Sequence, residues 1–478
     1  MKRFWLVLLS LGLIVAFSAS AMAVDVKFSG EYYAAGMYLD RTNVNKTSYT
    51  IPATLTTPAK LVDEGPSTAF YFQRLRLNTD FVVSPGLTLT ARADVMERSW
   101  GANRTAPGTA PDTMSAGTRS ENENIAFDLL YVTYVSPIGM FKAGYQIDDV
   151  WGLVFGNSSN PKGKIGYFLK TGGLTLGIQM GKDKELSRSV NNPNGDTDKD
   201  QSFYTAFGVY SWKTGEAGLL FKYIKNNQNR NAFGSLLGPL AQDAGFTWDG
   251  LVTTPYVKAK LGPVALEAQI YYLYGKMSWE GNTAGIPAPA LAAAGLKSTQ
   301  DVDLNQLTAY IDAVVDLGMF YVGGTLAYIS GDDPDTLDEQ EGGVLGGGLD
   351  WNPCLIMFNN DLTYWTGRQN GYNGSSNGGV MTNAYFGQLR AGVRPIDKLD
   401  IMASVSYATA DKTPQAVWDS REYGYEIDLT ATYKITNNLS YMLGGGYWIV
   451  GDYYTGTAAP NQDVDDNFMV INKLTLTF

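Results

Sequence analysis

The feature that most constrains the fold of this chain is a repeated pair of segments in which apolar and polar side chains alternate. One row of the first clear segment is mainly apolar and consists of Leu75, Leu77, Thr79, Phe81 and Val83. The intervening row is polar and consists of Arg74, Arg76, Asn78 and Asp80. Because successive side chains of a strand point to opposite faces, this pattern predicts a strand with one apolar and one charged face.

Short turns join such strands into hairpins. Ser84-Pro85-Gly86 leads into a second alternating segment that begins at Leu87, and Pro and Gly are typical of tight turns. The same unit recurs along the chain, with further turns expected at 136–139, 171–173, 213–216, 262–263, 318–319, 352–354, 395–398 and 436–438. These turns predict an all-β chain of about twenty strands, within a range of about 16 to 22.

Longer polar segments separate the hairpins and alternate with the short turns. They lie at 101–124, 182–201, 226–249, 280–301 and 367–383. Short turns at one end and long loops at the other are typical of transmembrane barrels, with the turns periplasmic and the loops extracellular. We therefore predict a transmembrane antiparallel β-barrel.

The two ends of the chain support export to a membrane. Lys2 and Arg3 precede an apolar run from Phe4 to Phe17, and Ala21-Met22-Ala23 has the small residues of a signal-peptidase site. We predict a cleaved signal peptide at residues 1–23 and a barrel at residues 24–478. A first strand over 24–39 leaves no room for a preceding plug domain. The final strand, 468–478, is amphipathic and ends at Phe478.

Composition excludes several classes of function. The formal net charge is -11, which argues against nucleic acid as a partner. The chain has no histidine and one cysteine, Cys354, so C-x-x-C-H haem attachment and a histidine general base are both excluded. The loop acids near Asp332 do not have the spacing of a calcium loop. We therefore expect no enzyme activity, no cofactor and no metal site.

A soluble two-sheet sandwich would show the same alternation of apolar and polar residues. The export signal, the number of strands and the aromatic terminus favour the barrel. Aromatic residues make up 13% of the chain, and several gather near strand ends, as at Tyr274 and Trp279. Such positions are typical of the girdles at membrane interfaces.

With these features the chain resembles the outer-membrane porins of Gram-negative bacteria, most closely those of deltaproteobacteria. The resemblance covers the signal, the strand series and Phe478, which it implies is read by the barrel assembly machinery. Gly144-Tyr145-Gln146 and the following residues to Phe155 resemble the strand that enters the third external loop, which in porins bends into the lumen.

The resemblance also implies a pore constriction. Asp148 and Asp149 would supply its acidic side, and Arg74, Arg76 and Arg92 its basic side. Opposite charges across a narrow aqueous gap create a transverse field that orients polar solutes. We expect charge reversal at Asp148 and Asp149 to shift the ion preference of the channel.

These features predict a water-filled channel for passive diffusion of small hydrophilic solutes and ions through the outer membrane. Two alternatives remain open. One is a barrel scaffold that houses multihaem cytochromes for electron transfer, and the other is a substrate-specific channel, in which Arg390 and Arg394 would take part. The expected partners are outer-membrane lipid, lipopolysaccharide and the assembly machinery, with a homotrimer as one possible state.

Overall fold

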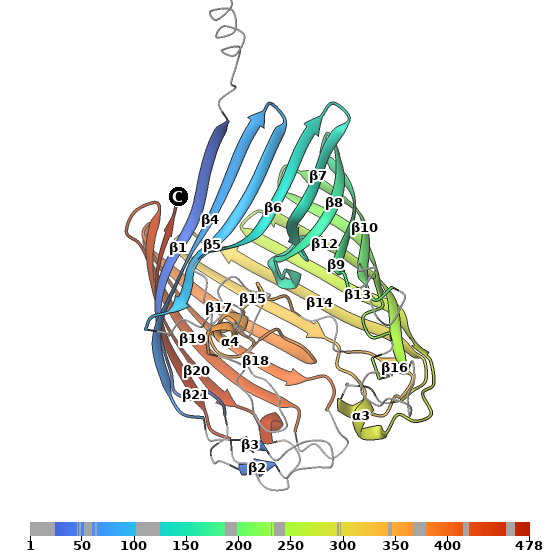
Figure 1. The fold of residues 1–478 in the computed structure, drawn as a ribbon. Coiled ribbons are helices and arrows are strands. Elements are labelled where there is room, and N and C mark those ends of the chain that lie inside the picture. The colour runs from blue at the N-terminus through green and yellow to red at the C-terminus, as the bar shows by residue number, and fades with distance from the viewer. Residues whose placement is uncertain are drawn as a thin grey trace, which may run out of the picture.

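A single large antiparallel sheet dominates the computed structural model (Figure 1). The structure describes residues 24–44, 46, 49–51, 60–62, 65–101, 125–186, 198–230, 232–233, 244–293, 296, 298–342, 347–366, 379–413, 420–455 and 464–478. The predicted signal peptide at residues 1–23, and much of several long connections, lie outside this part of the chain.

The main sheet contains 19 strands in the described part of the chain, one of which, β16 (Glu339–Gln340), is a two-residue strand paired in parallel with β14. The other 18 form the barrel wall. They are β1 (Asp25–Leu39), β4 (Thr68–Ser84), β5 (Leu87–Ser99), β6 (Ile125–Ser136), β7 (Gly139–Asp148), β8 (Asn160–Thr171), β9 (Leu174–Lys184), β10 (Gln201–Trp212), β11 (Gly215–Asn226), β12 (Gly245–Leu261), β13 (Val264–Glu280), β14 (Val302–Asp316), β15 (Phe320–Ile329), β17 (Ala384–Ile396), β18 (Leu399–Ala410), β19 (Glu422–Lys434), β20 (Leu439–Val450) and β21 (Asn467–Thr477).

The sheet closes on itself through its first and last strands. β1 pairs antiparallel with both β4 and β21, and every other wall strand pairs with its neighbours in chain order. At the seam, the backbone N–H of Gly30 donates to the carbonyl of Phe478, and the N–H of Phe478 donates back to Gly30. Closure leaves no unpaired sheet edge, which confirms the predicted antiparallel barrel.

Smaller elements are not part of the wall. A two-stranded sheet pairs β2 (Tyr49–Ile51) with β3 (Lys60–Val62), and the helices are α3 (Ala288–Ala293), α4 (Asn360–Thr366), η1 (Val154–Gly156) and η4 (Asp452–Thr455). Among the described residues, no helix has both the length and the apolar character needed to cross a lipid bilayer.

Short turns and long connections lie at opposite ends of the barrel (Figure 1). Eight hairpins within the described chain have a short turn, as between β4 and β5 or between β12 and β13. The turn predicted at 352–354 is wrong, because these residues lie in the connection from β15 to β17, together with α4. The apolar run that follows, Leu355 to Phe358, resembles a strand in sequence but is packed inside the barrel.

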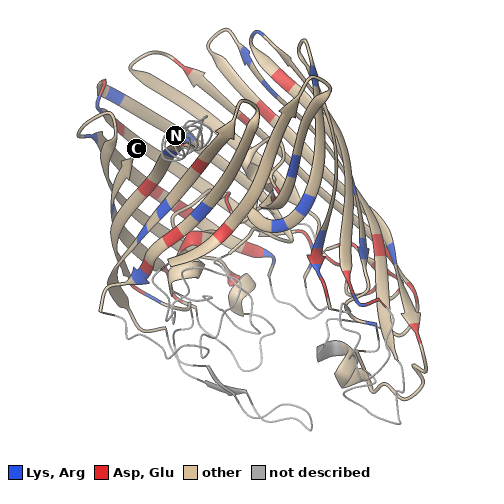
Figure 2. Cartoon of the chain, turned by 45° about the horizontal axis from the view of Figure 1, so that its top comes forward, with Lys and Arg blue, Asp and Glu red and all other residues tan. Residues whose placement is uncertain are grey.

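Burial on the wall is the inverse of that in a soluble protein. Large apolar side chains face outward and are exposed, as with Leu389 at 74% and Phe127 at 73%. Polar side chains face inward, and Gln306 and Glu426 are at most 1% exposed. Figure 2 shows residues of both charge signs on the same strands of the wall. The predicted alternation is therefore confirmed, with the charged rows turned to the lumen.

Candidate functional site

The connection between β7 and β8 turns into the lumen, and we call residues 149–159 the first inward segment. β7 ends at Asp148, and Asp149 adopts a left-handed backbone conformation with φ of 55°, which aspartate tolerates better than most residues. The indole N–H of Trp151 donates to the carbonyl of Thr254 on β12 at 2.9 Å. Since β12 is not adjacent to β7 or β8 in the wall, the segment crosses the interior.

A second segment, residues 347–366, enters the lumen from the connection between β15 and β17. We call it the second inward segment. Both carboxylate oxygens of Glu426 on β19 accept backbone N–H groups from it, from Ile356 at 2.7 Å and from Met357 at 2.6 Å. At its far end, Trp365 of α4 packs on Phe72 of β4 with ring centroids 4.4 Å apart. The segment therefore contacts the wall at β19 and again at β4, with β20, β21 and β1 between them.

The two inward segments meet in the lumen. The N–H of Gly348 donates to the carbonyl of Phe155 at 2.7 Å, and the N–H of Asp350 donates to that of Asn157 at 2.9 Å. A Cβ atom at Gly348 would lie 2.0 Å from the Asn157 carbonyl oxygen, so only glycine permits this approach. Together, these segments narrow the lumen.

On one side of this crossing lies a cavity of about 520 Å³ that we call the Lys cavity. Its charged lining consists of Asp148, Asp149, Lys162, Lys164, Asp183 and Lys222. Lys222 of β11 contacts Asp148 at 2.6 Å and Asp149 at 2.7 Å, and Lys164 contacts Asp148 at 2.8 Å. Burial alone would raise the pKa of the Asp149 carboxyl, but Lys222 and Lys162 hold that pKa well below its usual range. Asp149 is therefore charged at neutral pH.

A second cavity of about 530 Å³ contains the predicted arginines, and we call it the Arg cavity. Its charged lining consists of Arg74, Arg76, Arg92, Asp94, Glu97, Asp128, Asp350, Asp361, Asp428 and Lys473. Arg76 binds Asp94 through two hydrogen bonds, at 2.6 and 2.7 Å. Arg74 pairs with Glu97 at 3.3 Å, and Arg92 pairs with Asp128. All three pairs join adjacent strands of the wall.

Aromatic rings also line the Arg cavity. The ring of Tyr33 lies 5.1 Å from the Arg74 guanidinium carbon and 4.5 Å from the Lys473 ammonium. Such cation–π contacts are favourable where the cation is partly desolvated. A solute entering this cavity therefore meets both charge signs and an aromatic face.

The five predicted constriction residues all line the lumen, but the structure does not bring them together. Arg74, Arg76 and Arg92 lie in the Arg cavity, whereas Asp148 and Asp149 lie in the Lys cavity. Among the described side chains, no ion pair joins the two sets, because each has counter-charges of its own. The two sets line different cavities, and a transverse field between them stays a prediction. Phe478, the predicted assembly signal, lies at the closing seam with Gly30.

Sequence analysis missed the residues that neutralise Asp148 and Asp149. Lys222 lies on β11, where alternation alone could have turned it to the lumen together with Leu220 and Ile224. Its pairing with Asp148 could not be predicted, since it depends on the path of the first inward segment. The part played by Glu426 depends in the same way on the second inward segment.

Comparisons with known proteins show likeness at the level of structure only. No protein-family model matches the chain, and no curated protein matches it. A crystal structure of Pseudomonas aeruginosa OpdK with vanillate is 12% identical, covers 95% of this chain and 99% of its own, and has a TM-score of 0.45. The corresponding values for Pseudomonas aeruginosa OccK9 (OpdG) are 14%, 95%, 99% and 0.49. A BenF-like porin from Pseudomonas fluorescens Pf-5 gives 12%, 95%, 99% and 0.46. The fold assigned above depends on the strand pairing of this chain itself.

Proposed function

We propose that the protein is an outer-membrane porin, a water-filled channel through which small hydrophilic solutes and ions diffuse passively. The observation that carries this proposal is the inverted burial of the closed barrel. An apolar outer face on every side would be unstable in water and fits a lipid environment. The polar inner rows require water or polar partners.

The width of the barrel supports a channel. Small barrels of about eight strands can be filled by their own side chains, whereas barrels of 16 to 18 strands leave an aqueous lumen. Here the two inward segments divide that lumen into the Arg and Lys cavities. Their mixed charges favour polar solutes over apolar ones, because an apolar solute cannot replace the water that solvates these charges.

A substrate-specific channel is the second candidate. The two cavities, at about 530 and 520 Å³, fall in the size range of small-molecule sites. The contact of Tyr33 with both Arg74 and Lys473 provides an aromatic surface beside fixed cations. These features favour selection of small charged solutes over diffusion of any solute below a size limit.

The cytochrome scaffold is not favoured. The inward segments of this chain occupy the interior where a second folded chain would have to lie, and Phe155, Trp351 and Trp365 pack tightly there. A multihaem protein would have to displace this packed cluster.

Several features of the proposal come from the sequence alone. They are the cleaved signal peptide, the periplasmic position of the short turns, contact with lipopolysaccharide, recognition of Phe478 by the assembly machinery, a homotrimer and a deltaproteobacterial origin. The signal peptide and the assembly signal would place the barrel in a Gram-negative outer membrane, and periplasmic short turns would put its long connections outside.

Planar bilayer recordings of the purified, refolded protein test the proposal. We expect stepwise conductance in symmetric salt, and reversal potentials in a salt gradient would give the ion preference. Liposome swelling with neutral and charged sugars of equal size would separate general diffusion from selective transport. Heat-unfolded protein from the same preparation serves as the control. A sealed bilayer at high concentrations of folded protein would overturn the proposal.

A further inference from the structure

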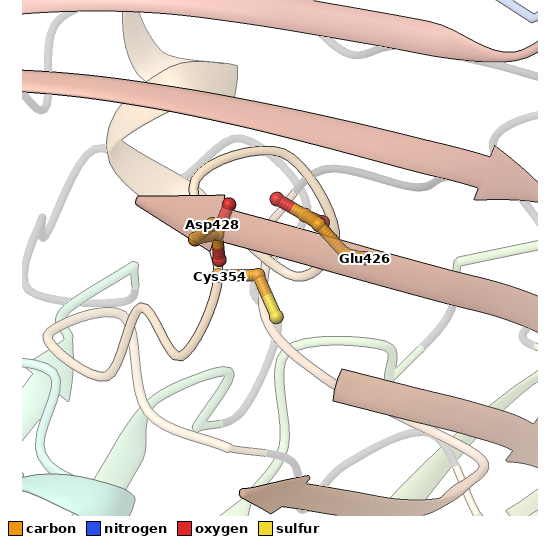
Figure 3. Close-up of side chains that lie close together, drawn as sticks. All are labelled: Cys354, Glu426 and Asp428. Carbon is orange, nitrogen blue, oxygen red and sulfur yellow. The ribbon is translucent and has the colours of Figure 1, made fainter. Parts of the chain in front are cut away.

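A buried sulfur and two buried carboxylates converge where the second inward segment contacts the wall. Glu426 and Asp428 lie two residues apart on β19 and both face the lumen, and Cys354 lies on the second inward segment (Figure 3). One donor atom from each of these residues lies within 4.8 Å of the other two. The three side chains are at most 3% exposed.

These carboxylates have no cationic side chain to balance them. Among the described residues, no ion pair joins Glu426 or Asp428 to a lysine or arginine, whereas Asp94, Asp148 and Asp149 each have such a partner. Glu426 accepts two backbone N–H groups, which still leaves lone pairs on each oxygen. Asp428 is 3% exposed, and its Oδ1 has no hydrogen-bond partner among the described atoms. Burial of unbalanced carboxylates costs several kcal/mol per ion unless a proton or a cation compensates.

The donor set indicates which cation fits. A cysteine sulfur with two carboxylate oxygens suits borderline divalent metals such as Zn²⁺, whereas Mg²⁺ and Ca²⁺ prefer oxygen donors alone. Bonds of about 2.0 to 2.3 Å in tetrahedral geometry place donors about 3.5 Å apart, so modest side-chain rotations would close the observed site. Cys354 and Asp428 also line the Arg cavity, which gives an ion a route in and leaves room for a water as the fourth ligand.

We propose that Cys354, Glu426 and Asp428 bind one divalent metal ion of the zinc class. The metal ties the second inward segment to β19 and replaces the missing positive charge. Sequence analysis predicts no metal site, because Cys354 lies more than 70 residues before Glu426 and Asp428 in the chain. The three side chains converge only in the folded barrel. The site holds the segment in place and takes no direct part in solute passage.

The single cysteine makes a direct spectroscopic test possible. The refolded full-length barrel is stripped of metal, reduced under anaerobic conditions and titrated with Co²⁺. We expect a thiolate-to-cobalt charge-transfer band that saturates at one equivalent and disappears when Zn²⁺ is added. Because the chain has one cysteine, such a band can arise only from Cys354. Absence of the band from barrel shown to be folded by its heat-modifiable gel migration would overturn the proposal.

Variants test the two carboxylates. Asp428→Asn and Glu426→Gln should each weaken Zn²⁺ binding, measured by competition with a chromophoric chelator, by at least the 10- to 100-fold that loss of an outer-shell partner costs. Thr432→Val, further along the same face of β19, is the matched control and should leave the Kd unchanged. Equal Zn²⁺ affinity in the wild type and in Cys354→Ser would show that binding occurs elsewhere and would also overturn the proposal.

Discussion

The Arg and Lys cavities both contain acidic and basic side chains, yet their ion pairs connect different parts of the structure. In the Arg cavity, each arginine pairs with an acid on an adjacent strand, as Arg76 does with Asp94, which is its register partner. In the Lys cavity, Lys222 of β11 pairs with acids at the end of β7, and several strands lie between these two. The charge pairs named in the first cavity join adjacent strands of the wall. In the second cavity, Lys222 and Lys162 also pair with Asp149 and so connect the wall to the first inward segment.

This difference shows how a barrel can fix the position of an inward segment. Pairs between adjacent strands add to contacts that the backbone ladder already makes. Pairs that cross the lumen provide contacts that the ladder cannot make, so their loss should change the shape of the channel as well as its stability. Variants in the two cavities can therefore separate these roles.

The largest effect is expected from Asp148→Asn together with Asp149→Asn. This change leaves Lys162, Lys164 and Lys222 without two of their counter-charges in a partly buried site. Breaking a buried pair by removing one partner costs about 3 to 5 kcal/mol. We expect a clear fall in the urea midpoint for unfolding from lipid vesicles, and a shift of the reversal potential toward anion preference.

Neutralisation is a cleaner test than the charge reversal suggested by the sequence, because two new lysines there would add repulsion among three existing ones. Asp335→Asn with Asp338→Asn is the matched control, since it removes two charges from exposed positions. If both double variants shift the reversal potential equally, Asp148 and Asp149 have no special place in the ion path.

An intermediate effect is expected from Gly348→Ala, which acts where the inward segments meet. The new methyl group would lie 2.0 Å from the Asn157 carbonyl oxygen, so the two segments must separate. Overpacking of this kind costs about 1 to 3 kcal/mol. We expect single-channel conductance to rise, because the segments that narrow the lumen no longer hold together.

Gly324→Ala provides the comparison for that variant. Its Cβ would meet its nearest neighbour, a Leu389 methyl group, at an ordinary 3.5 Å, so neither conductance nor stability should change. Unaltered conductance in Gly348→Ala would mean that the crossing of the inward segments does not control the channel width.

The wall was predictable from the sequence, and the lumen was not. Alternation along segments such as Leu75 to Val83 sets which side chains face inward, because a strand has a period of two whatever surrounds it. The closing strand up to Phe478 followed from the same pattern. The expected strand count exceeds the observed one partly because Leu355 to Phe358 are apolar like a strand but lie on an inward segment.

Contacts inside the lumen depend on where a loop goes after it leaves its strand. The pairing of Asp148 with Lys222 and that of Glu426 with the backbone of Ile356 each join positions about 70 residues apart. No local periodicity encodes such a contact. The inward bend after Asp149 was expected only from the resemblance to porins. The residues that contact it could be identified only from the structure.

The smallest effect is expected from Arg76→Lys in the Arg cavity. Lysine keeps the positive charge beside Asp94 but cannot reproduce the two parallel hydrogen bonds at 2.6 and 2.7 Å. The pair joins adjacent strands whose backbone ladder remains. We therefore expect the free energy of unfolding, measured by urea titration, to fall by about 1 kcal/mol or less. The reversal potential should not change. Arg76→Met is the informative contrast, because it leaves Asp94, which is 4% exposed, without its cation. If Arg76→Lys altered ion selectivity as strongly as the double variant at Asp148 and Asp149, the wall pairs would also shape the ion path, and the distinction between the two cavities would fail.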